Sequence, residues 1–122
     1  MASTEPRRGE VWLVSFGAAR PGEPGKNRPA VVVSSDSLGT GTAADLMVVV
    51  PLSRSSAPSV LRPEIRGIEG VDRPSRAICR SVRGVARSRL LRRLGLLAPE
   101  TLNEVERALA LILELDPIST AN

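Results

Sequence analysis

Two polar residues, Arg28 and Ser53, each stand at the end of an apolar run and could handle a phosphate group. The chain offers few other means of catalysis. It has no histidine and one cysteine, so the commonest acid–base residue and the usual zinc ligand sets are missing. Its carboxylates lack a metal-binding spacing, and no Walker loop, GxSxG elbow or dinucleotide fingerprint occurs. We therefore expect no metal and no cofactor, which leaves phosphate chemistry performed by arginine and hydroxyl groups.

RNA is the substrate that needs least from such residues, because each strand carries its own nucleophile, the 2′-hydroxyl. An enzyme that cuts RNA has only to orient that hydroxyl in line and to stabilise the negative phosphorane. Arg28 and Ser53 fit this task. In the alternative interpretation, Arg28 forms a structural salt bridge, for example with Glu23, and Ser53 only caps a turn.

The segments on which these two residues stand favour a common site. Pro29 fixes its own φ and pushes Arg28 towards an extended conformation, so that its guanidinium is held at the mouth of a strand. The apolar runs 30–34 and 46–52 read as strands, the first buried on both faces. If they lie side by side, Arg28 and Ser53 open onto one site.

Charge is segregated along the chain. The window from Arg73 to Arg93 contains eight arginines and no acid, whereas the whole chain has a net charge of only +4. A strongly positive face of this kind suits phosphates or an acidic protein partner. We expect it to bind a polyanion, with Arg80 and Arg83 as candidate contacts.

The remaining pattern predicts a mostly β fold of the α+β class. Further strands are expected at 10–16, 60–65, 77–79, 82–86 and 92–97, with 60–65 at an edge because Pro63 interrupts it. Residues 17–27 and 36–45 read as flexible connections. A helix should begin at Pro99 and end before Pro117, with an apolar stripe formed by Leu102, Val105, Leu109, Ile112 and Leu113. Together they suggest a small antiparallel β-barrel with a C-terminal helix.

The chain is long enough for one domain, expected at residues 7–116 between flexible tails at 1–6 and 117–122. No apolar run could span a membrane and the N-terminus lacks the apolar region of a signal peptide, so we expect a cytoplasmic protein. The unpaired Cys79 agrees with a reducing compartment, and we interpret it as a small buried hydrophobe.

An ordered series of landmarks resembles the MazF/PemK toxins of type II toxin–antitoxin systems. The series runs through Arg8–Val14, Gly22–Ser34, Val48–Ser53, Cys79–Val85, Arg89–Leu90 and Leu94–Gly95, and it covers about residues 7–115. The resemblance implies an SH3-like barrel that forms a homodimer, metal-independent and sequence-specific cleavage of mRNA, tRNA or rRNA, and a cognate antitoxin that blocks the active groove.

Matched residue by residue, the resemblance identifies Arg28 as the catalytic arginine and puts Ser53 where many members have a catalytic threonine. The RNA-binding candidates are Glu23, Lys26, Asn27, Arg54, Arg80, Ser81 and Arg83. Two departures stand out: Pro24 replaces a frequent glutamine, and Arg80 replaces a common acid. The second should alter which RNA is preferred, towards a charge-dense folded RNA such as tRNA.

Two other classes of function share this sequence pattern. One is a non-catalytic nucleic-acid-binding barrel, although Trp12 and Phe16 are the only aromatic residues available for base stacking. The other is a toxin of the same fold that poisons a topoisomerase, which fold alone does not exclude.

Overall fold

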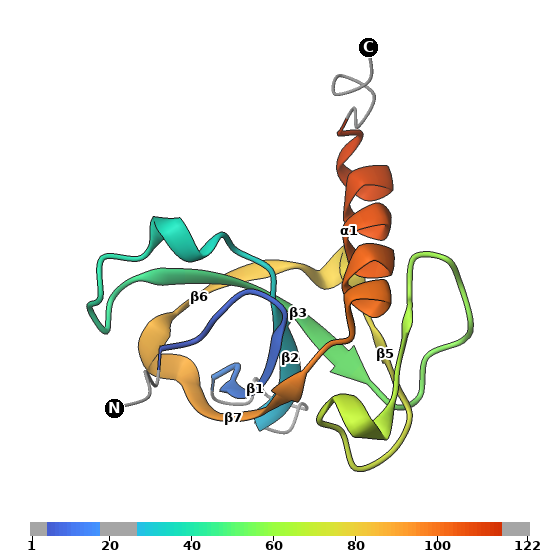
Figure 1. Ribbon diagram of the computed structural model, residues 1–122, viewed down its shortest axis with the longest axis horizontal. Helices are drawn as coiled ribbons and strands as arrows, with labels where there is room; N and C mark the ends of the chain where they lie inside the picture. The colour runs from blue at the N-terminus through green and yellow to red at the C-terminus, as the bar shows by residue number, and fades with distance from the viewer. Residues whose placement is uncertain (1–4, 18–26, 116–122) are drawn as a thin grey trace.

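The chain folds into a strongly curled antiparallel sheet with one helix against it (Figure 1). The computed structural model describes residues 5–17 and 27–115. The sheet order is β4-β5-β3-β2-β1-β7, and β6 pairs with β3. The elements are β1 (Glu10–Ser15), β2 (Asn27–Val32), β3 (Leu46–Ser53), β4 (Glu64–Ile65), β5 (Ser75–Ala77), β6 (Arg83–Ala86), β7 (Leu90–Leu96) and α1 (Pro99–Leu113).

Strand β3 is the centre of the sheet. One of its edges pairs with β2 through Val49 to Pro51, while β6 and β5 pair with its two ends, at Leu46–Val49 and Leu52–Ser53. Between β5 and β6 the backbone leaves this ladder and forms a 3₁₀ turn over Cys79–Ser81. Pro51 has no N–H to offer a ladder, and proline in a central strand is found where pairing is interrupted.

Because neighbouring residues of a strand point to opposite faces, the apolar runs feed two cores. Val11, Val31 and Val50 belong to the core under α1, together with Val105 and Ala108 of the helix. On the opposite face a second core is made by Trp12, Val14, Ala30, Val32, Val49, Val85 and Leu90. The prediction that the second strand is buried on both faces is therefore confirmed.

The N-terminus of α1 is capped by a distant glutamate. Ala98, at the N-cap, has no side chain that could accept a hydrogen bond, but its N–H donates to Glu69 at 2.8 Å. The Arg66 N–H donates to the same carboxylate at 2.8 Å. Burial by itself raises the pKa of Glu69, but these hydrogen bonds and one from Thr101 outweigh it, so the pKa lies below its ordinary value.

Gly95 of β7 allows this glutamate turn to approach the sheet. A Cβ built on Gly95 would lie 2.6 Å from the Cα of Gly70, which itself has a φ of 117°. Only glycine tolerates that contact and that backbone conformation without strain. The turn carrying Glu69 is thus locked between β7 and the start of α1.

Most predicted elements are present, with shifted ends. The first strand is confirmed at Glu10–Ser15, but the second begins three residues before Ala30 and so includes Arg28 and Pro29. A proline can occupy this position in the strand, because the one hydrogen-bonding group that Pro29 lacks is its backbone N–H. The strand expected at 60–65 is reduced to Glu64–Ile65, at the predicted edge of the sheet. The two short strands around Arg80 and Ser81 are found at 75–77 and 83–86.

The predicted helix is present, and it ends before Pro117 as expected. Helix α1 begins at Pro99, also as expected, and it ends at Leu113, where Glu114 adopts a left-handed conformation with φ 55°. Pro117, which was expected to stop the helix, lies outside the described residues. Leu113 is 53% exposed, so it does not belong to the buried stripe. Across residues 5–17 and 27–115, no helix has the length and apolarity needed to cross a membrane.

Two segments expected to be flexible are tied to the domain. Glu5 pairs with Arg87 at 3.1 Å, and the Arg8 N–H donates to Asp36 at 2.7 Å. In the 36–45 connection, Asp45 accepts hydrogen bonds from Thr40 and from the Gly41 N–H. The hydrogen bond from the Thr40 hydroxyl is the main cause that lowers the pKa of Asp45. The tails at 1–4 and 116–122, and most of the 17–27 connection, lie outside the described residues.

Candidate active site

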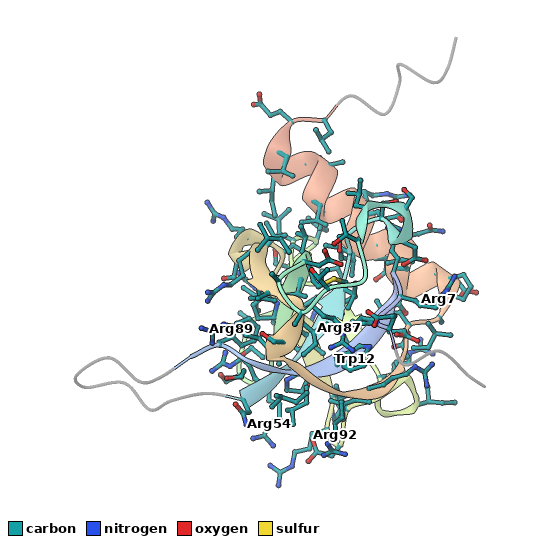
Figure 2. All side chains as sticks on the ribbon, turned by 90° about the vertical axis from the view of Figure 1, so that its left-hand side faces the viewer. Arg7, Trp12, Arg54, Arg87, Arg89 and Arg92 are labelled. Atoms are coloured by element: carbon teal, nitrogen blue, oxygen red, sulfur yellow. The ribbon has the colours of Figure 1, made fainter. Side chains whose placement is uncertain are left out.

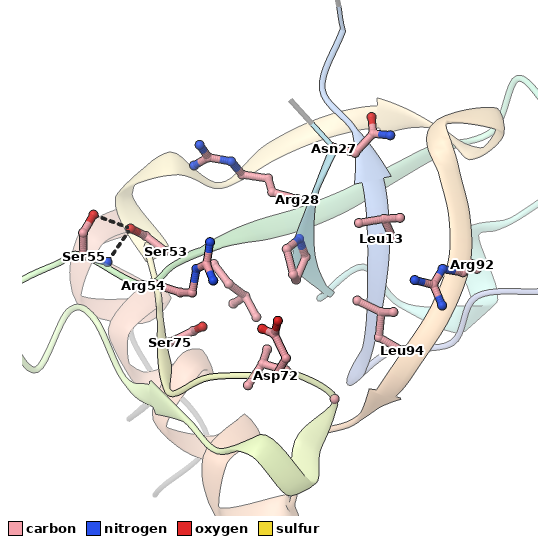
Figure 3. A pocket seen from close by; sticks show the side chains of 14 residues that line it. Leu13, Asn27, Arg28, Ser53, Arg54, Ser55, Asp72, Ser75, Arg92 and Leu94 are labelled. Atoms are coloured by element: carbon pink, nitrogen blue, oxygen red, sulfur yellow. Dashed lines mark hydrogen bonds between the residues drawn. The ribbon is translucent and has the colours of Figure 1, made fainter. Parts of the chain in front are cut away.

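A pocket of about 650 Å³ opens at the end of the sheet where β2 begins and β3 ends (Figure 3). Its size is in the range of small-molecule sites, roughly 300–1,000 Å³. The floor is apolar and comes from Leu13, Pro29, Leu52, Val71 and Leu94. The polar lining consists of Asn27, Arg28, Ser53, Arg54, Ser55, Asp72, Ser75 and Arg92.

Strand register brings Arg28 and Ser53 to this pocket. The ladder between β2 and β3 pairs Val32 with Val49 and Ala30 with Pro51. Extending the same register by two residues places Arg28 opposite Ser53, just beyond the last ladder pair. Residues that far apart in the chain meet because an antiparallel pairing joins the beginning of one strand to the end of the other. The sequence-based expectation that the two residues line one site is thus met.

The Ser53 hydroxyl is oriented by its own loop. Its oxygen accepts the Ser55 N–H at 3.2 Å, and the two serine hydroxyls lie 3.5 Å apart. This is the turn-capping role considered as an alternative for Ser53. The two roles are compatible, because an oxygen that accepts from the backbone keeps its own proton to donate.

The arginines of the pocket have no acidic partner among residues 5–17 and 27–115. Arg28, Arg54 and Arg92 form no ion pair among the described residues, whereas Arg7, Arg8, Arg87 and Arg93 each pair with a carboxylate. Arg54 and Arg92 project from the end of the molecule opposite to the free end of α1 (Figure 2). Among the described residues of the lining, Asp72 is the one acid. Three arginines against one carboxylate make the pocket attractive to phosphate.

The other predicted RNA contacts are distributed unevenly. Asn27 and Arg54 line the pocket. Arg80 and Ser81 lie in the exposed 3₁₀ turn beside β3, and Arg83 stacks over Phe16 with its guanidinium carbon 5.3 Å from the ring centre. None of these three lines the pocket. Glu23 and Lys26, including the alternative in which Glu23 pairs with Arg28, lie outside the described residues.

Sequence reasoning missed two charged residues of the lining. Arg92 belongs to the arginine window and faces the pocket because it pairs with Leu13 in the β1–β7 ladder. Asp72 is the last acid before that window. The position of Asp72 at the boundary of the basic segment was the one feature of the sequence that could have marked it as a functional residue. The sequence pattern does not show that the chain returns there to the pocket beside β2, the strand of Arg28.

The described residues include no cluster of three or more His, Cys, Asp or Glu side chains that could hold a metal ion. Cys79 is fully buried in the core under α1, and burial raises its pKa to about 11. A thiol in that environment stays protonated and inert at neutral pH. The interpretation of Cys79 as a small buried hydrophobe is confirmed.

Comparison with known proteins agrees with this geometry. Endoribonuclease MazF9 of Mycobacterium tuberculosis is 34% identical over 117 residues, which cover 89% of this chain and 97% of the relative. The crystal structure of MazE-MazF (Form-II) from Deinococcus radiodurans has a TM-score of 0.78 at 23% identity, covering 93% of this chain and 100% of the other.

A mycobacterial endoribonuclease in complex with its cognate antitoxin has a TM-score of 0.73 at 22% identity, covering 91% of this chain and 97% of that one. These structural likenesses establish a shared fold. A model of the family described as PemK-like, MazF-like toxin of type II toxin–antitoxin system matches residues 7–113. The chain therefore belongs to the PemK-like, MazF-like toxin family of type II toxin–antitoxin systems.

Proposed function

We propose that this toxin is an endoribonuclease that cuts RNA without a metal, by attack of the 2′-hydroxyl on the adjacent phosphate. The observation that carries the proposal is the meeting of Arg28 and Ser53 at a pocket whose arginines have no acidic partner among the described residues. The 34% identity to an endoribonuclease supports the same activity. RNA would supply its own nucleophile, so the protein need only orient the 2′-hydroxyl and stabilise the negative phosphorane.

In the proposed reaction, the 2′-oxygen forms a bond to phosphorus while the bond from phosphorus to the 5′-oxygen breaks. The 2′-hydroxyl loses a proton and the leaving 5′-oxygen gains one, which gives a 5′-hydroxyl and a 2′,3′-cyclic phosphate. Addition of water to the cyclic phosphate can then break its 2′-oxygen bond and give a 3′-phosphate with a free 2′-hydroxyl. Negative charge builds on the phosphorane, where the planar guanidinium of Arg28 would donate two parallel hydrogen bonds. A guanidinium offers hydrogen-bond donors and no acceptor, so Arg28 acts mainly by electrostatic stabilisation.

Ser53 is assigned to the scissile phosphate. Its oxygen already accepts the Ser55 N–H, so its hydroxyl proton is the part left to donate to a phosphate oxygen. A hydroxyl held in this way loses little rotational freedom when substrate binds. Threonine at this position would keep the donor and restrict its rotamers further.

The test is cleavage of matched oligonucleotides in EDTA. RNA should be cut in the presence of EDTA, and the same strand with a single 2′-deoxy nucleotide at the cut site should be inert. If the deoxy strand were cut, or if EDTA stopped the reaction, the attacking group would be a water and the mechanism would be wrong. Binding of RNA without any cut would favour a non-catalytic nucleic-acid-binding protein. Inhibition of a topoisomerase without RNA cleavage would favour a toxin that poisons a topoisomerase.

Variants separate the two roles. Arg28→Ala should abolish cleavage while the far-UV circular dichroism spectrum stays that of the wild type. Arg28→Lys should rescue little, because a point charge replaces the planar fork. Ser53→Thr should remain active and Ser53→Ala should be slow. Full activity of Arg28→Ala would refute the assignment.

A cognate antitoxin is the second proposed partner. The solved mycobacterial relative is a complex of an endoribonuclease with its cognate antitoxin, which supports a similar complex here. An acidic segment of such a protein would suit the unpartnered arginines of the pocket. The expected result is competition: bound antitoxin should block both RNA binding and cleavage.

We also propose that the toxin acts as a homodimer. Among the described strands, β7 pairs with β1 alone, and its Leu91 and Leu96 are 48% and 54% exposed. An exposed apolar edge strand is a surface that proteins usually cover. Light scattering should give twice the monomer mass of 13.0 kDa, and a stable monomer at micromolar concentration would contradict the proposal.

A further inference from the structure

We propose that Asp72 selects guanine at the nucleotide bound in the pocket, a role that rests on the RNA cleavage proposed above. Of the fourteen described residues that line the pocket, Asp72 is the one carboxylate and three are arginines. It is exposed, and it forms no hydrogen bond or ion pair in the described structure, although Arg54 also lines the pocket (Figure 3). A free acceptor therefore points into a site otherwise built for anions.

The backbone around Asp72 is held firmly on both sides. Before it come Gly70, in a left-handed conformation with φ 117°, and the buried Val71. After it, the hydroxyl of the buried Ser75 donates to the Arg73 carbonyl at 3.0 Å. The preceding Glu69 is only 2% exposed and hydrogen-bonded to the start of α1. The carboxylate is thus presented from an anchored turn, as recognition of a specific group requires.

A carboxylate in this position works against phosphate. It repels the anionic backbone and would also oppose the charge that develops on the phosphorane, so it is poorly suited to act next to the scissile group. Arg28 and Ser53 lie on the upper and left walls in Figure 3, and Asp72 lies on the lower wall beside the apolar floor. A nucleotide whose phosphate meets Arg28 would direct its base across that floor, towards Asp72.

The chemistry of an ionised carboxylate then determines which base it accepts. It has acceptors only, and its two oxygens match a pair of parallel N–H donors. Guanine alone among the four bases presents such a pair, N1–H and N2–H, on its Watson–Crick edge. Adenine and cytosine offer a single amino group beside an acceptor nitrogen, and uracil offers one N–H between two carbonyls. Single-stranded RNA exposes these edges for readout.

The first arm of the test compares the cut sites of wild type, Asp72→Asn and Glu64→Gln in a random RNA pool, by sequencing the new 5′ ends. Glu64 is an exposed acid of β4 outside the pocket lining, so Glu64→Gln removes the same charge as a control. The wild type and Glu64→Gln should share a motif with guanine at one fixed position. Asp72→Asn should still cut but should lose that guanine.

The second arm replaces that guanine by inosine, which lacks only the N2 amino group. This change should lower kcat/KM of the wild type roughly tenfold to a hundredfold and that of Asp72→Asn by less than threefold, as expected for one bidentate base contact. The proposal is overturned if the wild-type motif lacks guanine, or if Asp72→Asn keeps the motif. It is equally overturned if Asp72→Asn loses rate on every sequence alike, which would mark a general base.

A binding arm keeps the two proposals separate. Single strands with 2′-fluoro groups cannot be cut, so their affinity reports recognition without chemistry. Tighter binding of guanine than of inosine strands, lost in Asp72→Asn, would support the role of Asp72 even if no RNA were cleaved. Absence of cleavage would refute the proposed enzyme, and equal affinity for both strands would refute guanine selection.

Discussion

Binding of RNA should depend on salt to an extent set by the unpartnered arginines of the pocket. Arg28, Arg54 and Arg92 line it without a carboxylate partner among the described residues. If each contacts one phosphate, log affinity should fall against log salt with a slope of about −2, since a single-stranded phosphate contact contributes about −0.7. Raising the salt from 50 to 200 mM should then weaken binding about twentyfold.

Removing one of these arginines should change the slope and not only the affinity. Arg54→Gln keeps most of the side-chain length but removes the charge, so the slope should become about −1.4 and the loss over the same salt range about sevenfold. Arg107→Gln is the matched control, because Arg107 is an exposed arginine of α1 outside the pocket lining. Its slope should equal that of the wild type.

The measurement is fluorescence anisotropy of a short labelled 2′-fluoro strand, which the toxin cannot cut, at four or more salt concentrations. An unchanged slope for Arg54→Gln would show that Arg54 contacts no phosphate. If the affinity of the wild type for RNA did not change with salt, the proposal that the pocket binds phosphates would be wrong. A slope well beyond −2 would mean that RNA also reaches arginines outside the pocket, such as Arg80 and Arg83, and would contradict the count of three.

Three further predictions concern the scaffold. Glu69→Gln should lower stability by about 2 kcal/mol and Tm by roughly 10 °C at pH 7, because the buried carboxylate accepts several hydrogen bonds at the start of α1. Since the folded-state pKa is lowered, this contribution is present above pH ~4.5 and is lost as pH falls through the folded-state pKa, so the melting curves of wild type and variant should converge as the pH is lowered below that range. Gly95→Ala should cost about 1–3 kcal/mol in urea unfolding, because its Cβ meets the Gly70 backbone, whereas Gly84→Ala has open space around it and should be near neutral. Cys79, with a pKa raised to about 11 by burial, should not react with a thiol reagent at pH 8 until the protein is unfolded.

The local pattern of apolar residues was sufficient to predict the strands and the helix. The apolar runs around Val31 and Val49, and the stripe from Leu102 to Ile112, identify strands and helix because alternation and 3.6-residue periodicity are properties of neighbouring residues. Element ends were predicted less well. Helix α1 ends at Leu113 through a left-handed Glu114, and Pro117, three residues further on, predicts the end of the helix without predicting at which residue it falls.

Contacts between distant segments were beyond such reasoning. The cap of α1 by Glu69, thirty residues upstream of Pro99, depends on how the turn at Gly70 packs against Gly95. Likewise, which arginines of the basic window serve the pocket is decided by strand register. Arg92 faces it because it pairs with Leu13, while Arg83, in a strand on the other side of β3, stacks on Phe16.

The sequence by itself determined the family, the two central strands and the residues Arg28 and Ser53 at their ends, because each of these is written in contiguous residues. The tertiary structure decided how the site is completed. Antiparallel register set Arg28 opposite Ser53, and the return of the chain at Gly70 placed Asp72 on another wall of the same pocket. The neighbours of a residue in space depend on the packing of the whole chain. The sequence around Asp72 therefore does not indicate that Asp72 lines the same pocket as residues of β2 and β3.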